Sequence, residues 1–265
     1  MESMDTASND DDVVVTVGDD HVAQVEICRA PNNFFDLGLI RALVAAYERI
    51  DADARCRAIL LCSEGKHFCA GADFSPSARR LQAPGEDEGA LYREAVRMFE
   101  TRKPIVAAVQ GGAIGGGLGL ACAADFRIAS PDSRFSANFA RLGFHHGFGL
   151  SVTLPEIVGR QRAMDLLYRG SRISGEQAAA IGLADALVTS AELRAAARSL
   201  AADIGASAPL AVEAIRSTLR GDLADRVRAA VDHELAEQKR LRSTEDWAEG
   251  IRASTERRDP EFRGR

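Results

Sequence analysis

The residues best suited to chemistry are the glycines of a stretch that runs from Gln110 to Ala129. Six glycines fall between Gly111 and Gly119. They follow Pro104 to Val109, an apolar run typical of a buried strand, and lead into Leu118 to Ala124, which is typical of a helix start. Such a junction leaves backbone N–H groups unpaired and lets a ligand approach them closely. A tight turn with close helix packing is the plainer interpretation, but it needs fewer glycines. The pattern therefore favours a ligand site.

The commonest explanations of a glycine-rich loop do not fit this one. No register matches the dinucleotide-binding pattern GxGxxG, because the third glycine falls on Leu120 or Cys122. The Walker pattern fails because Gly117 is followed by Leu118 and not by lysine. The sequence also has no GxSxG nucleophile elbow, and no HExxH or cysteine–histidine cluster that would indicate a metal. We therefore expect no metal site.

A second loop of small residues has a similar setting. Phe68 to Asp73 (FCAGAD) follows Ala58 to Cys62 (AILLC), which predicts another buried strand. Small residues are needed where the useful atoms are main-chain N–H groups. Two such groups that converge on one point form an oxyanion hole for a carbonyl that becomes an enolate or a tetrahedral oxyanion. We hypothesise that the two loops meet in this way.

Strands and helices must alternate to position these loops. The sequence predicts a hairpin around Gly18-Asp19-Asp20, a helix capped by Asp36, and a helix from Leu91 to Glu100. A capping box at Ser174 opens a further helix, and from Ser190 onward the chain is predicted to be helical. This order indicates an α/β body with a helical C-terminal region.

Composition and charge exclude several classes of protein. The 265 residues can bury a substantial core, and a net charge of −6 gives no reason to expect a nucleic acid or a membrane as partner. No apolar run approaches the length of a membrane span. Residues 1–12 are polar and acidic without a secretory signal, and we expect a disordered tail. The five cysteines lack CxxC spacing, so we expect reduced thiols in a cytoplasmic protein.

Several segments together resemble the enoyl-CoA hydratase/isomerase (crotonase) family. HFCAGAD is followed by KPIVAAVQGGAIGGGLGLACAADFRIA, then by GRQRAMDLLYRGSRISGEQAAAIGLADALV, and near the end DWAEG precedes RRDPEF. The resemblance covers nearly the whole chain from Val13 onward. It implies a crotonase-like spiral of ββα units. Residues 13–205 would form the acyl-CoA-binding core, and residues 206–265 a helical region that assembles a trimer or a dimer of trimers.

The same resemblance implies an acyl-CoA thioester as partner, with CoA as part of the substrate and no separate cofactor. It places the two oxyanion donors at the N–H groups of Ala70 and Gly116. Three residues would lie along the CoA arm, namely Ala72, Asp73 and Phe74. Three more would contact the substrate, namely Gly115, Gly119 and Phe139.

Two positions depart from the pattern with which this family adds water. Hydratases hold two glutamates beside the acyl chain, one as acid and one as base. The first follows the glycine run, where this chain has Gly119. The second belongs to a segment of the type F-x-x-P-E, where this chain has Phe139. Neither side chain moves a proton, so hydration by a glutamate pair is not expected.

Two neighbouring histidines are the candidates for the missing acid or base. His145 and His146 lie in GFHHGFG, and His146 takes the place where family members commonly carry proline. A histidine with an ordinary pKa of about 6.5 suits a general base. The alternative is that one or both cap a helix or hydrogen-bond the loop. Two functions stay open: an acyl-CoA lyase or isomerase that stabilises an enolate, and a non-catalytic acyl-CoA-binding or regulatory subunit.

Overall fold

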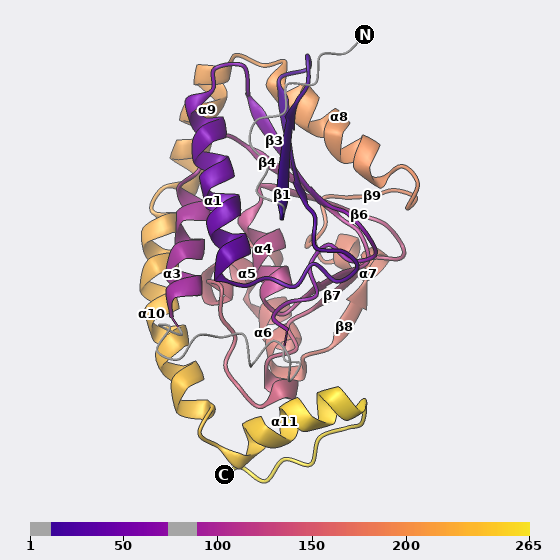
Figure 1. The fold of residues 1–265 in the computed structure, drawn as a ribbon, viewed down its shortest axis with the longest axis vertical. Coiled ribbons are helices and arrows are strands. Elements are labelled where there is room, and N and C mark those ends of the chain that lie inside the picture. The colour runs from indigo at the N-terminus through magenta and orange to yellow at the C-terminus, as the bar shows by residue number, and fades with distance from the viewer. Residues whose placement is uncertain (1–11, 74–88) are drawn as a thin grey trace.

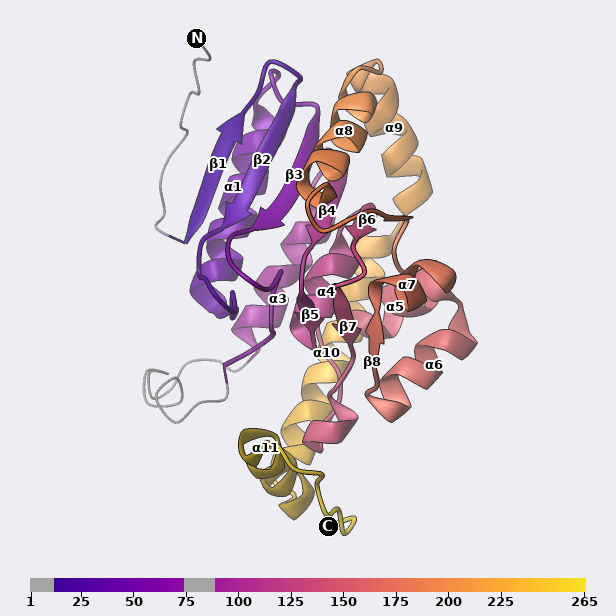
Figure 2. The same cartoon turned by 90° about the vertical axis from the view of Figure 1, so that its right-hand side faces the viewer.

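The computed structural model describes residues 12–73 and 89–265, and a mixed β-sheet forms its centre (Figures 1 and 2). Strands β1 (Val13–Val17) and β2 (Val22–Ile27) form the predicted antiparallel hairpin. Four further strands extend the sheet in parallel: β3 (Ala58–Ser63), β4 (Ile105–Val109), β6 (Phe126–Ala129) and β9 (Ala186–Leu187). Because β3 and β4 are parallel neighbours, the two loops rich in small residues leave the sheet at the same edge.

A smaller sheet continues from that edge. It consists of β5 (Gly112–Ile114), β7 (Arg134–Ser136) and β8 (Arg172–Ser174), in that order. β5 is parallel to β7, and β7 is antiparallel to β8. β5 lies inside the glycine run, where the sequence predicts no strand. An isolated parallel bridge joins Cys69 to Ala113, so the loop after β3 runs beside β5.

Helices cover both faces of the main sheet, as Figure 2 shows. On one face, α8 (Leu193–Gly205) packs on alternate side chains of β3 and β4. The other face is covered by α1 (Leu37–Ala52), α3 (Ala90–Val96) and α4 (Gly116–Ala123). β3 and β4 are buried along their whole length for this reason. The helix predicted from Leu91 to Glu100 is divided, since α3 ends at Val96 and a 3₁₀ turn, η1 (Arg97–Glu100), follows it.

The local capping signals predicted from the sequence are present. Asp36 accepts the N–H of Leu39 at 2.9 Å at the start of α1. Ser174 and Gln177 form the capping box at the start of α7 (Gly175–Ala180). Between β7 and β8 the chain forms η2 (Ala140–Leu142), α5 (Leu150–Val158) and α6 (Arg160–Arg169).

The C-terminal region consists of α9 (Pro209–Arg220), α10 (Leu223–Leu241) and α11 (Glu245–Glu256). α10 packs on α3 and α5, and α11 packs on η2 at the end of the molecule drawn in yellow in Figure 1. The predicted fold, an α/β crotonase-like core with a helical C-terminal region, is confirmed. The division at residue 205 stays a prediction. None of the helices in the described residues combines the length and hydropathy that a bilayer span requires.

Candidate active site

The two loops rich in small residues meet at the carboxyl ends of β3 and β4. Cys69 N donates to Gly112 O at 2.9 Å, and Ile114 N donates to Cys69 O at 3.0 Å. α4 begins at Gly116, directly after β5. The structure therefore confirms the expected meeting of the two loops.

Close packing explains several of the glycines in the run. Gly115 has a backbone φ of +58°, a value that residues other than glycine rarely adopt. A Cβ on Gly117 would lie 2.1 Å from the carbonyl oxygen of Cys69, and a Cβ on Gly116 would lie 2.2 Å from the ring of Phe35. The first turn of α4 can therefore approach the loop after β3 and Phe35 only because these positions carry no side chain.

Ala70 does not present a free donor. Its N–H donates to the carbonyl oxygen of Asn32 at 2.9 Å. The buried side chain of Asn33 ties the same segment to the loop after β3, because its amide donates to Glu64 O at 2.8 Å. A ligand could use the Ala70 N–H only by breaking an existing hydrogen bond. The assignment of Ala70 as an oxyanion donor is therefore wrong, although Ala70 lines the cleft described below.

Ala72 and Gly116 present N–H groups instead. Within residues 12–73 and 89–265, neither N–H has a hydrogen-bond acceptor. Gly116 is the first residue of α4, and the first N–H groups of a helix have no acceptor inside it. The two segments lie against each other, because a Cβ on Gly71 would lie 4.0 Å from Gly116 N. Ala72 and Gly116 therefore form a pair of neighbouring backbone donors.

Both donors line a cleft of about 1270 Å³. Part of its lining is basic and comprises Lys66, Arg134 and Arg172. None of these three forms an ion pair with a carboxylate of the described residues. Another part is apolar and aromatic and comprises Phe35, Tyr92, Phe139, Leu142 and Phe144. The cleft can thus accommodate a ligand with an anionic part and an apolar part.

The predicted substrate residues differ in position. Ala72, Asp73, Gly115 and Phe139 line the cleft, and their contact with substrate stays a prediction. Phe74 lies outside the described residues.

Gly119 does not line the cleft, because Phe148 covers it. A Cβ on Gly119 would lie 2.5 Å from Phe148 Cβ. Phe148 is 1% exposed, and its ring meets those of Phe35 and Tyr92 edge to face at centroid distances of 5.9 and 6.3 Å. The expectation that Gly119 contacts the substrate is therefore wrong.

His145 and His146 also lie outside the cleft lining. His146 Nε2 hydrogen-bonds Ser151 Oγ at 2.8 Å, and His145 Nδ1 hydrogen-bonds the backbone oxygen of His146 at 2.8 Å. Burial, together with the nearby His145 and His233, lowers the pKa of His146 to about 3. His146 is thus neutral at pH 7 and a very weak base. The structure favours the alternative to the acid or base role, because His145 hydrogen-bonds its own loop and His146 hydrogen-bonds Ser151 in the first turn of α5.

His67 and Tyr92 also line the cleft, although no sequence motif predicted a role for either. His67 Nδ1 accepts the N–H of Gly112 at 2.9 Å, which leaves the proton of the neutral ring on Nε2, and burial lowers its pKa. Burial raises the pKa of Tyr92, so its phenol stays protonated at neutral pH. The only sequence signal is the position of His67, directly before FCAGAD. No motif or periodicity indicates Tyr92.

Fold and site together define an enoyl-CoA hydratase/isomerase family protein. The family model of that description matches residues 18–265, so the chain belongs to this family. It is 34% identical over 251 residues to (E)-benzylidenesuccinyl-CoA hydratase of Thauera aromatica, covering 92% of this chain and 96% of the relative. It is 27% identical over 266 residues to the mitochondrial Delta(3,5)-Delta(2,4)-dienoyl-CoA isomerase of Mus musculus, covering 95% and 81%.

The solved structures agree with this assignment. The crystal structure of carnitinyl-CoA hydratase from Mycobacterium avium superposes with a TM-score of 0.85 at 28% sequence identity, covering 97% of this chain and 100% of that one. The relatives named here include hydratases and an isomerase. Family membership therefore does not determine the reaction, which has to be argued from the site of this chain.

Proposed function

We propose that this protein is an enzyme that acts on an acyl-CoA thioester and stabilises its enolate oxygen between the N–H groups of Ala72 and Gly116. The observation that carries the proposal is this pair of neighbouring donors, which lack an acceptor within the described residues and line the cleft. Preorganised donors aimed at developing negative charge accelerate a reaction, and removal of one such donor typically costs about 10²–10³-fold in rate.

The basic part of the cleft supports a CoA ligand. Lys66, Arg134 and Arg172 come from the loop after β3, from β7 and from β8, and all three line the same cleft. Phosphate groups form charge-assisted hydrogen bonds with arginine and lysine. We propose that these three side chains bind the phosphates of CoA.

The aromatic part of the cleft is proposed to bind the acyl group. Tyr92 lies there beside Phe148 and carries a protonated phenol. It is the side chain that we propose donates a hydrogen bond or a proton to the acyl group. With Gly119 and Phe139 at the positions of the expected glutamates, the reaction is not a two-glutamate hydration, and isomerisation or a lyase step is favoured.

A second candidate function is a non-catalytic acyl-CoA-binding or regulatory subunit. The specific observation in its favour is the packing of Phe148 on Gly119, which leaves no space for an acidic side chain there. The low pKa of His146 is a further argument, because that residue is then unsuited to replace the missing base.

A matched pair of variants tests the oxyanion proposal. Proline is tolerated at the first residue of a helix and lacks the N–H, but any Cβ at Gly116 meets the ring of Phe35. The comparison is therefore made in the Phe35→Ala background, between Gly116→Ala and Gly116→Pro. We expect exchange of the α-protons of an acyl-CoA in D₂O to be about 10²-fold slower in the proline variant than in the alanine variant.

The outcomes separate the candidate functions. Equal exchange rates in the two variants contradict the role of the Gly116 N–H. If the wild type binds a panel of acyl-CoA thioesters but neither exchanges nor converts any of them, the non-catalytic function is correct. If it binds none of them, both candidate functions are wrong.

We also propose that the chain forms a homo-oligomer through α9. Leu210, Ile215 and Leu219 of that helix are 80%, 58% and 83% exposed, which is unusual for large apolar side chains so close together. The trimer or dimer of trimers implied by the family resemblance would cover them.

A further inference from the structure

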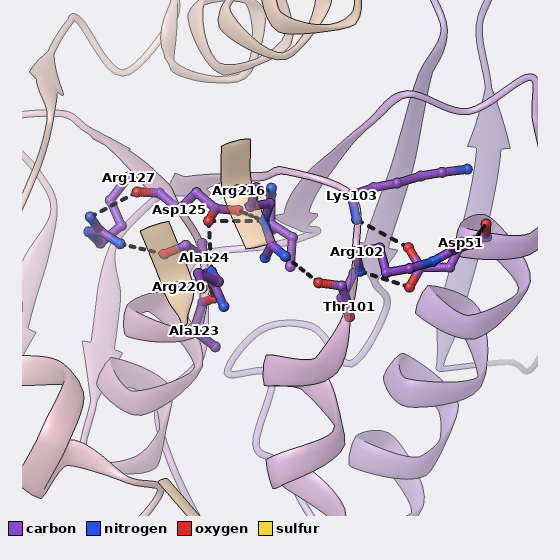
Figure 3. A network of polar contacts seen from close by, with 11 residues as sticks. Asp51, Thr101, Arg102, Lys103, Ala123, Ala124, Asp125, Arg127, Arg216 and Arg220 are labelled. Carbon is purple, nitrogen blue, oxygen red and sulfur yellow. Dashed lines mark hydrogen bonds and ion pairs between the residues drawn. The ribbon is translucent and has the colours of Figure 1, made fainter. Parts of the chain in front are cut away.

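A buried cluster of polar side chains lies away from the cleft, between α1, α9 and the start of β6 (Figure 3). Its centre is the carboxylate of Asp125. This carboxylate accepts the N–H of Ile105 at 2.8 Å, Arg216 Nε at 2.9 Å and Arg220 Nε at 2.9 Å. Two guanidinium groups therefore share one carboxylate.

Each guanidinium also donates to a backbone carbonyl and still has one nitrogen without an acceptor in the described part of the chain. Arg216 Nη1 donates to Thr101 O, and Arg220 Nη2 donates to Ala123 O at 2.8 Å. Arg216 Nη2 and Arg220 Nη1 are buried and have no acceptor within the described residues. Arg216 is 8% exposed. Buried donors of this kind are rare in folded proteins unless something accepts from them.

Tyr47 of α1 supplies a third donor. It is 2% exposed, and its hydroxyl likewise has no partner within the described residues. Tyr47 lies one helical turn before Asp51, whose carboxylate accepts the backbone N–H groups of Arg102 and Lys103, as Figure 3 shows for these three residues. This turn of α1 therefore faces the segment that continues from Thr101.

The Tyr47 hydroxyl lies within electrostatic range of the arginine pair. Burial raises the pKa of the Tyr47 phenol, Asp125 raises it further, and Arg216 and Arg220 act in the opposite direction. The charges of all three residues thus act on this hydroxyl.

The cluster has one positive charge in excess. Among residues 12–73 and 89–265, Arg216 and Arg220 form ion pairs with Asp125 alone. The neighbouring Arg127 is paired with Asp185 at 3.1 Å. Burial, together with the repulsion from Arg216, lowers the pKa of Arg220. A buried charge without a counter-charge is costly unless an ion or a polar group compensates it.

We propose that Arg216 Nη2, Arg220 Nη1 and Tyr47 Oη form a binding site for a small monovalent anion such as chloride. One such ion neutralises the excess charge and accepts from all three donors. The side chain of Arg220 is 14% exposed, so the cluster reaches the protein surface at this residue. The bound ion fixes α9 to α1 and to the start of β6, and it is unrelated to the acyl-CoA cleft.

The test measures the melting temperature of the full chain at constant sodium concentration while chloride replaces gluconate. A ligand that binds only the folded state raises the melting temperature with its concentration. We expect chloride or bromide to raise it by about 3 °C or more at about 0.5 M. The rise is expected to be at least halved in Tyr47→Phe and absent in Arg220→Gln. In crystals grown with bromide, an anomalous peak is expected within hydrogen-bond distance of Arg216 Nη2.

The control variant is Arg240→Gln. Arg240 lies on α10, where its exposed guanidinium pairs with Glu237, so this variant is expected to respond to chloride as the wild type does. General salt effects act on all variants alike. The proposal is overturned if chloride raises the melting temperatures of the wild type and Arg220→Gln equally. It is also overturned if crystals grown with bromide show no anomalous peak between these donors. If Arg220→Gln does not fold, Tyr47→Phe and the bromide crystal decide.

Discussion

Phe148 packs so closely on Gly119 that a Cβ at position 119 would lie 2.5 Å from the Cβ of Phe148. Phe148 itself has a φ of +64°, a conformation that is unfavourable for a bulky residue. The two positions therefore depend on each other: the glycine makes room for the phenylalanine, and the phenylalanine fills the space in which a side chain at position 119 would lie.

This dependence predicts non-additive stability. Gly119→Ala alone is expected to lower the free energy of unfolding by about 1–3 kcal/mol, because the new methyl group overpacks the site. Phe148→Gly alone leaves a cavity, but it also removes the unfavourable φ. The double variant is expected to have a free energy of unfolding about 1–3 kcal/mol higher than the value obtained by adding the effects of the two single variants. Urea unfolding of the four proteins measures this coupling, and strictly additive values contradict the packing described.

The pKa of His146 predicts how stability changes in acid. His146 titrates at about 6.5 in the unfolded chain, and burial lowers its pKa to about 3 in the folded protein. Between these pH values the unfolded state binds more protons, so the free energy of unfolding decreases as the pH falls from about 6.5 towards 3. His146→Gln removes this contribution. We expect the stability of the wild type relative to the variant to fall by up to about 3 kcal/mol between pH 7 and pH 4.

Urea unfolding of both proteins at the two pH values measures this difference. Parallel pH curves for wild type and variant contradict the lowered pKa. The same variant is expected to keep acyl-CoA turnover within about threefold of the wild type, since His146 does not line the cleft. A loss of two orders of magnitude, or a step in the wild-type pH profile near its ordinary pKa of about 6.5, restores His146 as a catalytic base.

Local signals in the sequence predict much of the fold. The cap at Asp36 and the capping box at Ser174 depend on residues within one helical turn, and both are present. The apolar runs of β3 and β4 are long and uninterrupted because helices cover both faces. β5 could not be predicted, since Gly112–Ile114 consists of small or single apolar residues without a periodic pattern.

The site was harder to predict, because its chemistry depends on contacts distant in sequence. The glycine pattern predicts the loops, and the family resemblance predicts Gly116 as a donor. The choice between Ala70 and Ala72 depends on the carbonyl of Asn32, which occupies the N–H of Ala70. The roles of His146 and Gly119 likewise depend on burial and on Phe148, which no local motif reveals.

The basic part of the cleft predicts salt-dependent binding of CoA. Arg172 lines the cleft without an ion-pair partner in the described residues. Arg172→Ala is expected to weaken the binding of CoA by about 10-fold, which corresponds to one charge-assisted contact of about 1.4 kcal/mol. Arg169→Ala is the matched control, because Arg169 is exposed, pairs with Asp165 and does not line the cleft. Isothermal titration at low and high salt measures both, and equal losses in the two variants contradict the assignment.

The exposed face of α9 predicts how the chain assembles. Ile215 and Leu219 are one helical turn apart and lie next to each other on the helix surface. In a homo-oligomer these side chains are buried, and a carboxylate placed among them is desolvated without a partner. We therefore expect the wild type to be an oligomer and the double variant Ile215→Glu, Leu219→Glu to be a folded monomer, as measured by light scattering after gel filtration.

The control for this assembly is Tyr168→Glu, because Tyr168 is also a large side chain, 70% exposed, but lies on α6. It is expected to assemble as the wild type does. A wild type that is monomeric at micromolar concentration contradicts the proposed oligomer. A double variant that assembles normally shows that the contact lies elsewhere. Circular dichroism of the double variant distinguishes a folded monomer from an unfolded chain, since the inward side of α9 keeps the contacts of Arg216 and Arg220 with Asp125.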